Sequence, residues 1–343
     1  QQESDAGPAG PDGLAAVRTV AAEALSAAAR LLGADEDETA LTHGTTEGVN
    51  IVLHGLDWMP GDELVTAELE HPALAQAAAV LEQRRGVIVR RVEFPADASP
   101  EQMLNAVEGA LSGRTRVVAL SHVQYSCGLR MPAREIADAA RHAGALVLYD
   151  GAQTGGHLRL DMRETGADFY AVSGQKWLLG PSGTGALFVR REAADWLRPL
   201  FAPSAERGRG RDLRPYEMTS HSPAALAGFA EAIAISEELG MDAIEERTRT
   251  LGDRLREALA SVPGVRLTGP SAPETSCGLV SIAVDGLEPQ DLAAQLWEES
   301  RVAARTVRLP AAVRFSTAHF NDEDDLARAE EAVARAAKRA AAS

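Results

Sequence analysis

Between about residue 14 and residue 192, short runs of β-forming residues alternate with alanine-rich stretches of helical composition. Strands that alternate with helices in this way form a mostly parallel sheet covered by helices. The expected strands are 63–67, 87–92, 116–121, 146–150, 169–173 and 186–190. The expected helices are 72–84, 100–111 and 132–142. Each of these helices has a proline near its start, where a missing backbone N–H costs no hydrogen bond. The pattern therefore predicts an α/β fold.

A second, smaller α/β unit is expected after a long helical stretch at 223–261. Its expected elements are strands near Val265, at 279–284 and at 301–306, and a closing amphipathic helix at 322–341. We therefore expect three parts: an N-terminal segment at 1–13, a large domain at 14–222, and an interdomain helix with a small C-terminal domain at 223–343.

Composition narrows the classes of protein that this chain can be. The net charge is −16, from 50 acidic and 34 basic residues, and no basic patch stands out, so nucleic acid and membrane surfaces are not expected partners. Apolar runs are of strand length, far below the roughly 20 residues of a membrane span. Two cysteines without a C-x-x-C pattern predict neither a disulfide scaffold nor a metal site, and favour the reducing cytoplasm.

Lysine usage is the most selective feature of the composition. Only Lys176 and Lys338 are lysines, and the other 32 basic residues are arginines. Lys338 lies in the alanine-rich C-terminal tail, where a solvated side chain is expected. Elsewhere in this chain, positions that need only a positive charge carry arginine. Lys176 is therefore a candidate for chemistry that requires an amine able to lose its proton.

The first motif, at 41–50, turns from a strand end through Gly44 into a helix that starts with Thr45, Thr46 and Glu47. Free N–H groups at a helix start, with hydroxyl groups beside them, suit a phosphate. The alternative is that Thr46 is an ordinary N-cap with no ligand. The motif is neither a Walker A loop nor a dinucleotide-binding fingerprint.

The second motif, at 146–153, is an apolar strand that ends on Asp150. In open α/β sheets, ligands collect at the carboxyl ends of strands. A carboxylate at this place either caps a turn or pairs with a buried cation, such as the ring nitrogen of a pyridinium.

The third motif, at 173–185, places Lys176 between a strand and a glycine-rich turn. In most proteins a lysine here is a surface residue. In this arginine-biased chain, the retained amine points to attack on a carbonyl, as an aldehyde cofactor would require.

Together the three motifs resemble those of fold-type I pyridoxal 5'-phosphate (PLP) enzymes of the class V aminotransferase and cysteine desulfurase family. The resemblance covers residues 41–321, and the motifs follow the family's order. It implies a large domain with a mostly parallel seven-stranded sheet and a smaller C-terminal α/β domain. It also implies that the chain binds PLP and acts on a small amino acid.

The resemblance assigns roles to the residues of these motifs. Lys176 would form the Schiff base with the cofactor and move the Cα proton. Asp150 would pair with the pyridinium nitrogen, and Gln153 would reach the ring's phenolic oxygen. The phosphate would be held by Thr45, Thr46 and Ser173.

Three residues outside these motifs also receive roles. His71 would stack on the ring, although without the resemblance it would be taken for a turn residue before a helix. Thr219 would reach the phosphate of a partner subunit, which implies a homodimer with shared sites. Arg314, in the closing segment 313–321, would clamp the substrate α-carboxylate with its planar fork.

The chain departs from cysteine desulfurases at three places. Those enzymes carry a nucleophilic cysteine on a loop before the carboxylate-binding arginine, and here the segment 307–313 has no thiol. Cys127 does not match the sulfur carrier and is expected to be a passive thiol. Gln175, beside the cofactor, stands where desulfurases have a histidine, which resembles the isopenicillin-epimerase-like and C–S-lyase-like branch. The family's N-terminal segment has little counterpart before Gly13.

The reaction expected from these features is β-elimination on a cysteine-derived amino acid. Transamination and epimerisation share its first step, loss of the Cα proton, and stay open as alternatives. A catalytically silent PLP-binding regulator and an α/β protein without PLP are further alternatives. Substrate orientation, rather than the cofactor-binding residues, decides between the reactions.

Overall fold

The computed structural model describes residues 10–200, 213–218 and 220–342, and the statements below concern these ranges. A seven-stranded sheet forms the centre of the larger part, with strand order β1-β7-β6-β5-β4-β2-β3. Its strands are β1 Thr39–Thr42, β2 Glu63–Ala67, β3 Ile88–Val92, β4 Thr115–Ser121, β5 Leu146–Asp150, β6 Phe169–Ser173 and β7 Gly185–Val189. Only β7 runs antiparallel to its neighbours, β6 and β1. The expected mostly parallel sheet is therefore confirmed.

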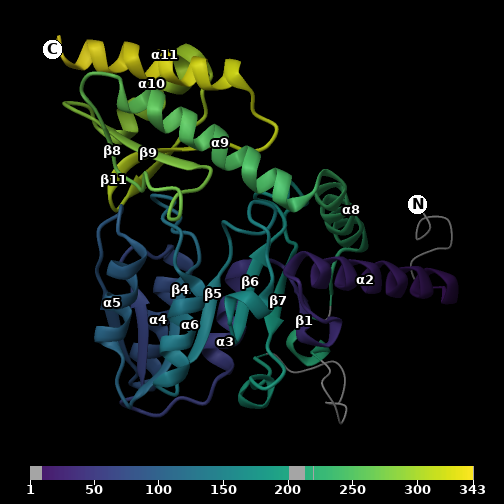
Figure 1. The fold of residues 1–343 in the computed structure, drawn as a ribbon. Coiled ribbons are helices and arrows are strands. Elements are labelled where there is room, and N and C mark those ends of the chain that lie inside the picture. The colour runs from purple at the N-terminus through teal and green to yellow at the C-terminus, as the bar shows by residue number, and fades with distance from the viewer. Residues whose placement is uncertain (1–9, 201–212, 219, 343) are drawn as a thin grey trace.

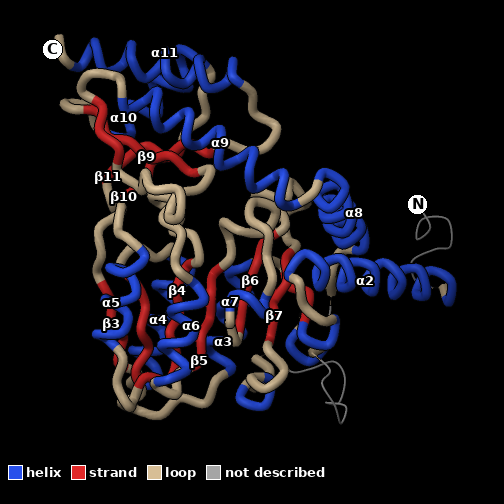
Figure 2. Tube along the Cα trace, viewed as in Figure 1, coloured by secondary structure: helices blue, strands red, loops and turns tan. Residues whose placement is uncertain are grey.

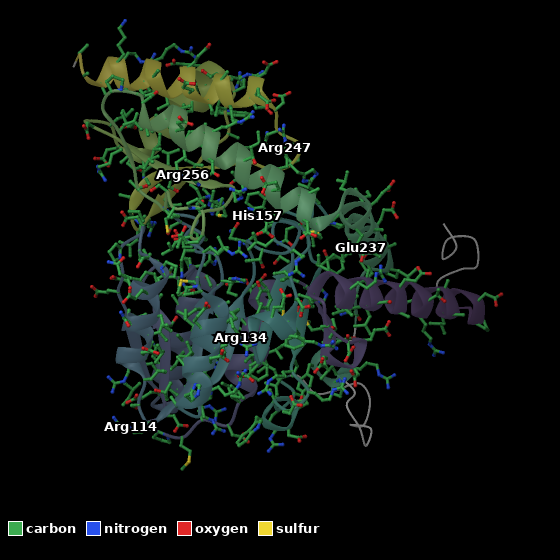
Figure 3. All side chains as sticks on the ribbon, in the orientation of Figure 1. Arg114, Arg134, His157, Glu237, Arg247 and Arg256 are labelled. Carbon is green, nitrogen blue, oxygen red and sulfur yellow. The ribbon has the colours of Figure 1, made fainter. Side chains whose placement is uncertain are left out.

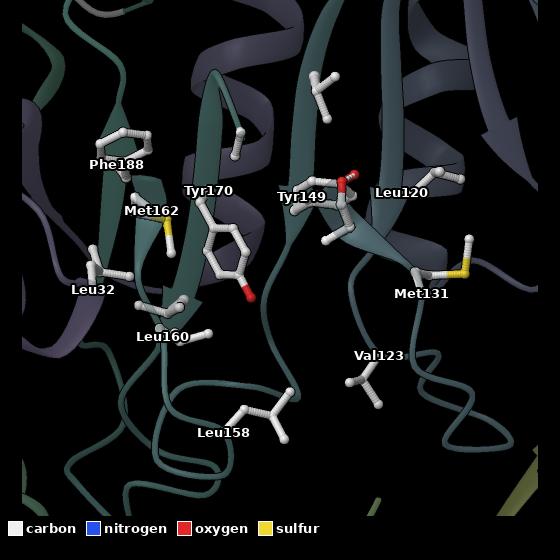
Figure 4. Close-up of a cluster of buried hydrophobic side chains, with 14 of the residues drawn as sticks. Leu32, Leu120, Val123, Met131, Tyr149, Leu158, Leu160, Met162, Tyr170 and Phe188 are labelled. Atoms are coloured by element: carbon white, nitrogen blue, oxygen red, sulfur yellow. Dashed lines mark hydrogen bonds between the residues drawn. The ribbon is translucent and has the colours of Figure 1, made fainter. Parts of the chain in front are cut away.

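Helices cover both faces of this sheet (Figures 1 and 2). Their bounds are α2 Pro11–Leu32, α3 Thr45–Gly55, α4 Pro72–Arg85, α5 Pro100–Ala110, α6 Ala133–His142 and α7 Met162–Thr165. Alternate strand residues enter two apolar clusters: Val118 and Leu120 pack on the side of α2, α5 and α6, whereas Val117 and Ala119 pack on the side of α3 and α4. This alternation is the period of two that a strand imposes. Figure 4 shows part of the first cluster, around Tyr149 and Tyr170.

The C-terminal part contains a second, four-stranded sheet with strand order β10-β11-β9-β8, in which all neighbours are antiparallel. Its elements are α8 Pro223–Leu239, α9 Met241–Ala260, β8 Val265–Leu267, β9 Leu279–Val284, α10 Pro289–Ser300, β10 Arg305–Arg308, β11 Ala311–Ser316 and α11 Glu323–Ala340. A third apolar cluster lies between this sheet and α9, α10 and α11. Figure 1 shows the small sheet above the large one, with α10 and α11 on its far side.

The structure differs from the sequence-based expectations at three places. The single helix expected at 223–261 is two helices, because the chain turns at Gly240, where φ is +84°. The strand expected at 301–306 lies at 305–308, and β11 follows it at once as the second strand of a hairpin. Helix α2 begins at Pro11, three residues before the expected start of the large domain.

A close approach of three strand ends requires glycine at position 185. Gly185 pairs with Thr42 of β1 on one side and with Ser173 of β6 on the other. A Cβ at Gly185 would lie 2.4 Å from the carbonyl oxygen of Val172 and 2.8 Å from the Cα of Gly44. Real Cβ atoms do not come this close to backbone atoms, so β1 and β6 meet across β7 only because residue 185 has no side chain.

Replacing Gly185 by alanine is expected to lower the free energy of unfolding by about 1–3 kcal/mol, because β1 or β6 must shift to admit the methyl group. The shift moves Gly44 away from Ser173, so we also expect weaker PLP binding. Urea unfolding and a PLP titration would measure the two effects. Gly113→Ala is the control, since nothing lies within 4 Å of a Cβ at Gly113. An equal change in both variants would contradict the packing argument.

Candidate active site

The predicted site residues gather at one edge of the large sheet. Strands β1, β2, β4, β5 and β6 all run in one direction, so their carboxyl ends meet at the same edge. Asp150 ends β5 and Ser173 ends β6, while Lys176, His71 and Thr45 follow β6, β2 and β1 within a few residues. Open α/β sheets bind their ligands at this edge.

A first cavity of about 380 Å³ opens at this edge. Four predicted site residues line it: Lys176, His71, Gln153 and Arg314. Its remaining lining residues are Tyr125, Trp177, Leu179, Arg305, Ser316, Ala318 and Phe320. Because Arg305, Arg314 and Ser316 belong to the small domain, the cavity lies between the two domains.

A second cavity of about 510 Å³ brings together the residues predicted to hold a phosphate: Thr45, Thr46, Ser173 and Gln175. The Ser173 Oγ accepts a hydrogen bond from the Thr45 backbone N–H at 2.9 Å, and lies 2.8 Å from the Thr45 Oγ1. Thr46 is exposed in the first turn of α3. A helix N-terminus with hydroxyl groups beside it binds an anion well.

Burial opposes the charge on both Lys176 and Asp150. Burial lowers the pKa of the Lys176 ammonium; the negative charge of Asp150 opposes this shift, and the positive charges of Arg314 and Arg305 add to it. Burial likewise raises the pKa of Asp150, while the Ala152 N–H, 2.9 Å from its Oδ1, and the charge of Lys176 lower it. A lowered pKa increases the fraction of free amine on Lys176, which is the form that attacks a carbonyl.

The orientation of the Gln153 side chain follows from one hydrogen bond. The indole Nε1–H of Trp177 lies 2.9 Å from the Gln153 Oε1. An indole N–H can only donate, so the oxygen of the amide faces Trp177 and its NH₂ group is left to donate into the first cavity. This arrangement suits an acceptor such as the phenolic oxygen of PLP.

His71 is the N-cap of α4, and its Nδ1 accepts the Ala73 N–H at 3.1 Å. Its ring meets Tyr125 edge to face, with ring centroids 4.9 Å apart. Burial lowers the pKa of His71, and the positive charges of Lys176, Arg305 and Arg314 lower it further. The neutral ring that results lines the cavity beside Lys176, where it can pack on the flat face of a cofactor.

Sequence reasoning missed His157, which connects the two domains behind the cavity. Its ring stacks on Trp177 with centroids 3.8 Å apart, and Figure 3 labels it between the two parts of the molecule. The Gly278 N–H donates to its Nε2 at 3.1 Å, and its Nδ1–H donates to the Gln153 carbonyl at 2.8 Å. The small domain therefore contacts, through one imidazole, the groups that hold Gln153 in place.

Arg314 and Arg305 come from the β10–β11 hairpin. Arg314 is partly buried, and its Nη1–H donates to the Tyr125 carbonyl. Burial lowers the pKa of Arg314 to about 10, and the charge of Arg305 contributes to this shift. Its buried Nε has no hydrogen-bond partner in the described part of the chain. An unpaired guanidinium donor beside Lys176 fits a substrate carboxylate.

Of the predicted site residues that the structure describes, Asp150 is buried at the end of β5 and lines neither cavity. Thr219 lies outside the described residues, so its role stays a prediction. Cys127 is fully buried and lines neither cavity, as expected of a passive thiol. The residues that sequence reasoning missed are Tyr125, His157, Trp177 and Arg305. Of these, Trp177 and Arg305 had a signal, since each lies within or next to a motif already singled out.

The two cavities, the buried Asp150 and the donor group of Gln153 fit PLP. Thr45, Thr46 and Ser173 would hold its phosphate, Asp150 its ring nitrogen and Gln153 its phenolic oxygen. When bound, PLP supplies an electron-withdrawing ring that stabilises negative charge at the substrate Cα. Lys176, which lines the first cavity, would bond its aldehyde.

Comparison with known proteins gives the family. The model of the class-V aminotransferase family matches residues 14–328, so the chain belongs to this family. It is a PLP-dependent enzyme of fold type I.

Relatives within the family have different activities. Isopenicillin N epimerase of Streptomyces clavuligerus is 30% identical over 91% of this chain and 83% of its own length. A probable cysteine desulfurase of Mycolicibacterium paratuberculosis is 33% identical over 89% of this chain, which spans only 47% of that relative.

Solved structures add a further likeness. A cystine C–S lyase in complex with its reaction product, cysteine persulfide, has a TM-score of 0.90 and 26% identity, over 96% of this chain and 90% of the lyase. A variant of that lyase carries glycine covalently linked to the PLP cofactor.

Within its described ranges, the present chain has no helix that is both long and apolar enough to cross a membrane.

Replacing His157 by glutamine is expected to flatten the pH dependence of stability of the cofactor-free protein. Burial lowers the pKa of His157 to about 4 in the folded protein, against about 6.5 when it is unfolded. The unfolded chain therefore binds the proton first, and stability falls as the pH drops through this window. The difference between the two pKa values corresponds to a fall of about 3 kcal/mol in the free energy of unfolding. The glutamine variant would not show this fall, because its side chain does not bind a proton. Urea unfolding at several pH values in this window would measure it, and equal slopes for the two proteins would contradict the account.

Proposed function

We propose that this enzyme catalyses β-elimination on a cysteine-derived amino acid, breaking its Cβ–S bond. The hairpin at the first cavity is the observation that carries this proposal. Only Leu309 and Pro310 separate β10 from β11, and Arg308 pairs with Ala311. A desulfurase needs a loop before its carboxylate-binding arginine to carry the nucleophilic cysteine. A two-residue turn at this place leaves no such loop.

The cysteines of the chain support the same conclusion. Cys127 and Cys277 are its only cysteines, and both are buried. Burial raises the pKa of each thiol to about 11, so neither provides a thiolate at neutral pH. The Sγ–H of Cys277 donates to the Gly128 carbonyl at 3.2 Å, and neither cysteine lines the first cavity. The sulfur therefore leaves with the product instead of passing to a protein thiol.

Substrate binding and proton removal each have a residue suited to them. Arg314 holds the α-carboxylate with its fork of donors. Lys176, whose pKa is lowered, takes the proton from Cα. The Cβ–S bond then breaks, and its electron pair leaves with the sulfur, which is protonated to a thiol or persulfide. The remaining three-carbon enamine takes up water to give pyruvate and ammonia.

Transamination and epimerisation begin with the same proton transfer. Epimerisation stays a candidate function because one relative is named as an epimerase. An intact set of Lys176, Asp150 and Gln153 argues against a catalytically silent regulator, because such a protein has no need of an electron-withdrawing ring. The products formed from one substrate distinguish these functions.

We further propose that the enzyme is a homodimer with shared sites, working in the cytoplasm. The second cavity has exposed apolar side chains in its lining, Leu200 and Met218, and Met218 directly precedes the predicted partner contact Thr219 in the sequence. Apolar side chains exposed at a predicted phosphate site suit coverage by a second subunit. Two unpaired, buried cysteines suit a reducing compartment.

Incubation of the PLP-loaded enzyme with S-substituted cysteines is expected to release pyruvate, ammonia and a thiol in equal amounts. Lys176→Arg is expected to abolish turnover and the visible absorbance of the bound cofactor, because arginine keeps the charge but cannot act as a free amine. A lactate dehydrogenase-coupled assay measures pyruvate. Formation of the pyridoxamine form, or of the D-amino acid, without pyruvate would replace elimination by transamination or epimerisation.

Cys127→Ala and Cys277→Ala, alone and together, are expected to keep pyruvate formation within about threefold of the wild type, once stability is matched by lowering the temperature. Neither thiol takes part in the proposed reaction. Removing a buried thiol costs packing energy of about 1 kcal/mol, so stability is the property expected to change. A loss of turnover above about 100-fold in a folded single variant would show that its thiol accepts sulfur.

A further inference from the structure

A second buried carboxylate, that of Glu70, is bound next to Asp150. Glu70 follows β2 and directly precedes His71, and only 5% of its surface is exposed. Its carboxylate accepts hydrogen bonds from the backbone N–H and the hydroxyl of Ser121, and from the Gln124 side-chain amide at 3.0 Å. Ser121 ends β4 and pairs in register with Asp150, which ends β5. The Glu70 carboxylate is therefore fixed to the strand end that adjoins Asp150.

These two carboxylates lack the cationic partners that a buried acid has elsewhere in the chain. Glu63, the buried acid at the other end of β2, contacts Arg90 and Arg114 at 2.7 and 2.9 Å. In the part of the chain that the structure describes, neither Glu70 nor Asp150 forms an ion pair with an arginine or lysine. Burial raises the pKa of Glu70 to about 7; the charge of Asp150 adds to this shift, and the hydrogen bonds that Glu70 accepts oppose it. Two buried carboxylates without a cation are costly, so the pair suits a cationic group on a ligand.

The hydrogen bonds of Glu70 suit its ionised form. The backbone N–H of Ser121 can only donate, and Gln124 presents its NH₂ group to Glu70. The Gln124 Oε1 is buried and has no hydrogen-bond partner among the described residues, although a protonated Glu70 could donate to it. Burial lowers the pKa of His122, the residue after Ser121, to about 3, so this neighbour adds no charge. The charged group that acts on Glu70 is Asp150.

Glu70 lies behind Asp150 and not in the ligand's space. It lines neither cavity, whereas the next residue, His71, lines the first. Asp150 is the residue assigned to the ring nitrogen of PLP, which is a cation when protonated. Charges in a buried site attract over several ångströms, so a second carboxylate at the adjoining strand end strengthens the attraction for that nitrogen.

We propose that Glu70 is ionised when PLP is bound, and that its charge acts together with that of Asp150 to keep the ring nitrogen of the cofactor protonated. Glu70 is then a positioning residue for charge: it does not contact the cofactor and acts through space beside Asp150. A ring nitrogen held as a cation withdraws electrons from the substrate more strongly, whichever bond of the substrate breaks. The inference therefore does not depend on the proposed β-elimination.

A matched pair of cofactors tests the role of the Glu70 charge. In the deaza analogue of PLP a C–H group replaces the ring nitrogen, so the analogue has nearly the same shape but cannot carry the pyridinium charge. The wild type is expected to bind PLP more tightly than the analogue. Glu70→Gln keeps the shape of the side chain and removes its charge, and should lower this PLP-to-analogue affinity ratio by about 10-fold, the effect of one partly screened charge. Titration of the cofactor-free protein at about pH 8, above the pKa of Glu70, measures both affinities.

Two further variants separate the charge of Glu70 from its hydrogen bonds. Glu70→Asp keeps the charge but shortens the side chain, so both affinities should fall while their ratio stays near the wild-type value. Glu63→Gln is the matched control, because it removes a buried carboxylate from the other end of β2, and the ratio should not change. A wild-type ratio in Glu70→Gln would overturn the proposal and show that Glu70 only ties the end of β2 to β4. A ratio as low in Glu70→Asp as in Glu70→Gln, or equal affinities of the wild type for the two cofactors, would also overturn it.

A measurement on the wild type does not depend on whether a variant folds. At about pH 6.5 most of the Glu70 in the cofactor-free protein is protonated, because this pH lies below its pKa. A cation at Asp150 would expel that proton, so PLP should release more protons on binding than the analogue does. Changes at the phosphate and at Lys176 are common to both cofactors and cancel. Calorimetry in buffers of different ionisation enthalpy counts the protons, and equal counts for the two cofactors would overturn the proposal.

Discussion

The site depends on a geometric constraint of the large sheet: parallel strands carry their carboxyl ends to one edge. Asp150, Ser173 and Lys176 come from neighbouring strands β5 and β6, so a buried acid, a hydroxyl and an amine meet without any long loop to position them. The close approach of Gly44 and Gly185 brings the start of α3 to the same edge. Displacing β1 or β6 would therefore separate the phosphate-type cavity from the amine.

The small domain supplies Arg314, the guanidinium that we propose holds the substrate carboxylate. Arg314 reaches the first cavity from β11, and its contact with the Tyr125 carbonyl ties the hairpin to the loop after β4. A second tie runs from Gly278 through His157 to Trp177 and Gln153. The packing of the small domain against the large one and the orientation of the Gln153 amide thus share one set of contacts. This coupling is built from neutral groups, because burial lowers the pKa of His157 and its two ring nitrogens are occupied by backbone partners.

The difference from a sulfur-transferring enzyme lies in one short segment. The frame that holds PLP is shared across the family, whereas the turn at Leu309 and Pro310 leaves no place for a reactive thiol. The same hairpin carries Arg305 and Arg314 at opposed positions, and both line the first cavity. A change of turn length can therefore alter the proposed fate of the sulfur while Lys176 and Asp150 stay in place, because these two residues lie on the large domain and the hairpin belongs to the small one.

The sequence by itself determined the class of fold and the central residues of the site. Alternating strands and helices predicted the sheet, because their periods and proline positions are local properties of the chain. Lys176 was found because a chain with 32 arginines had kept a lysine between a strand and a glycine-rich turn. His157, Tyr125 and the opposition of Arg305 to Arg314 were decided only by tertiary structure. Their partners lie on other elements, as with His157 and Gly278, 121 positions apart. No local pattern records such contacts, because packing and register, rather than propensity, bring those groups together.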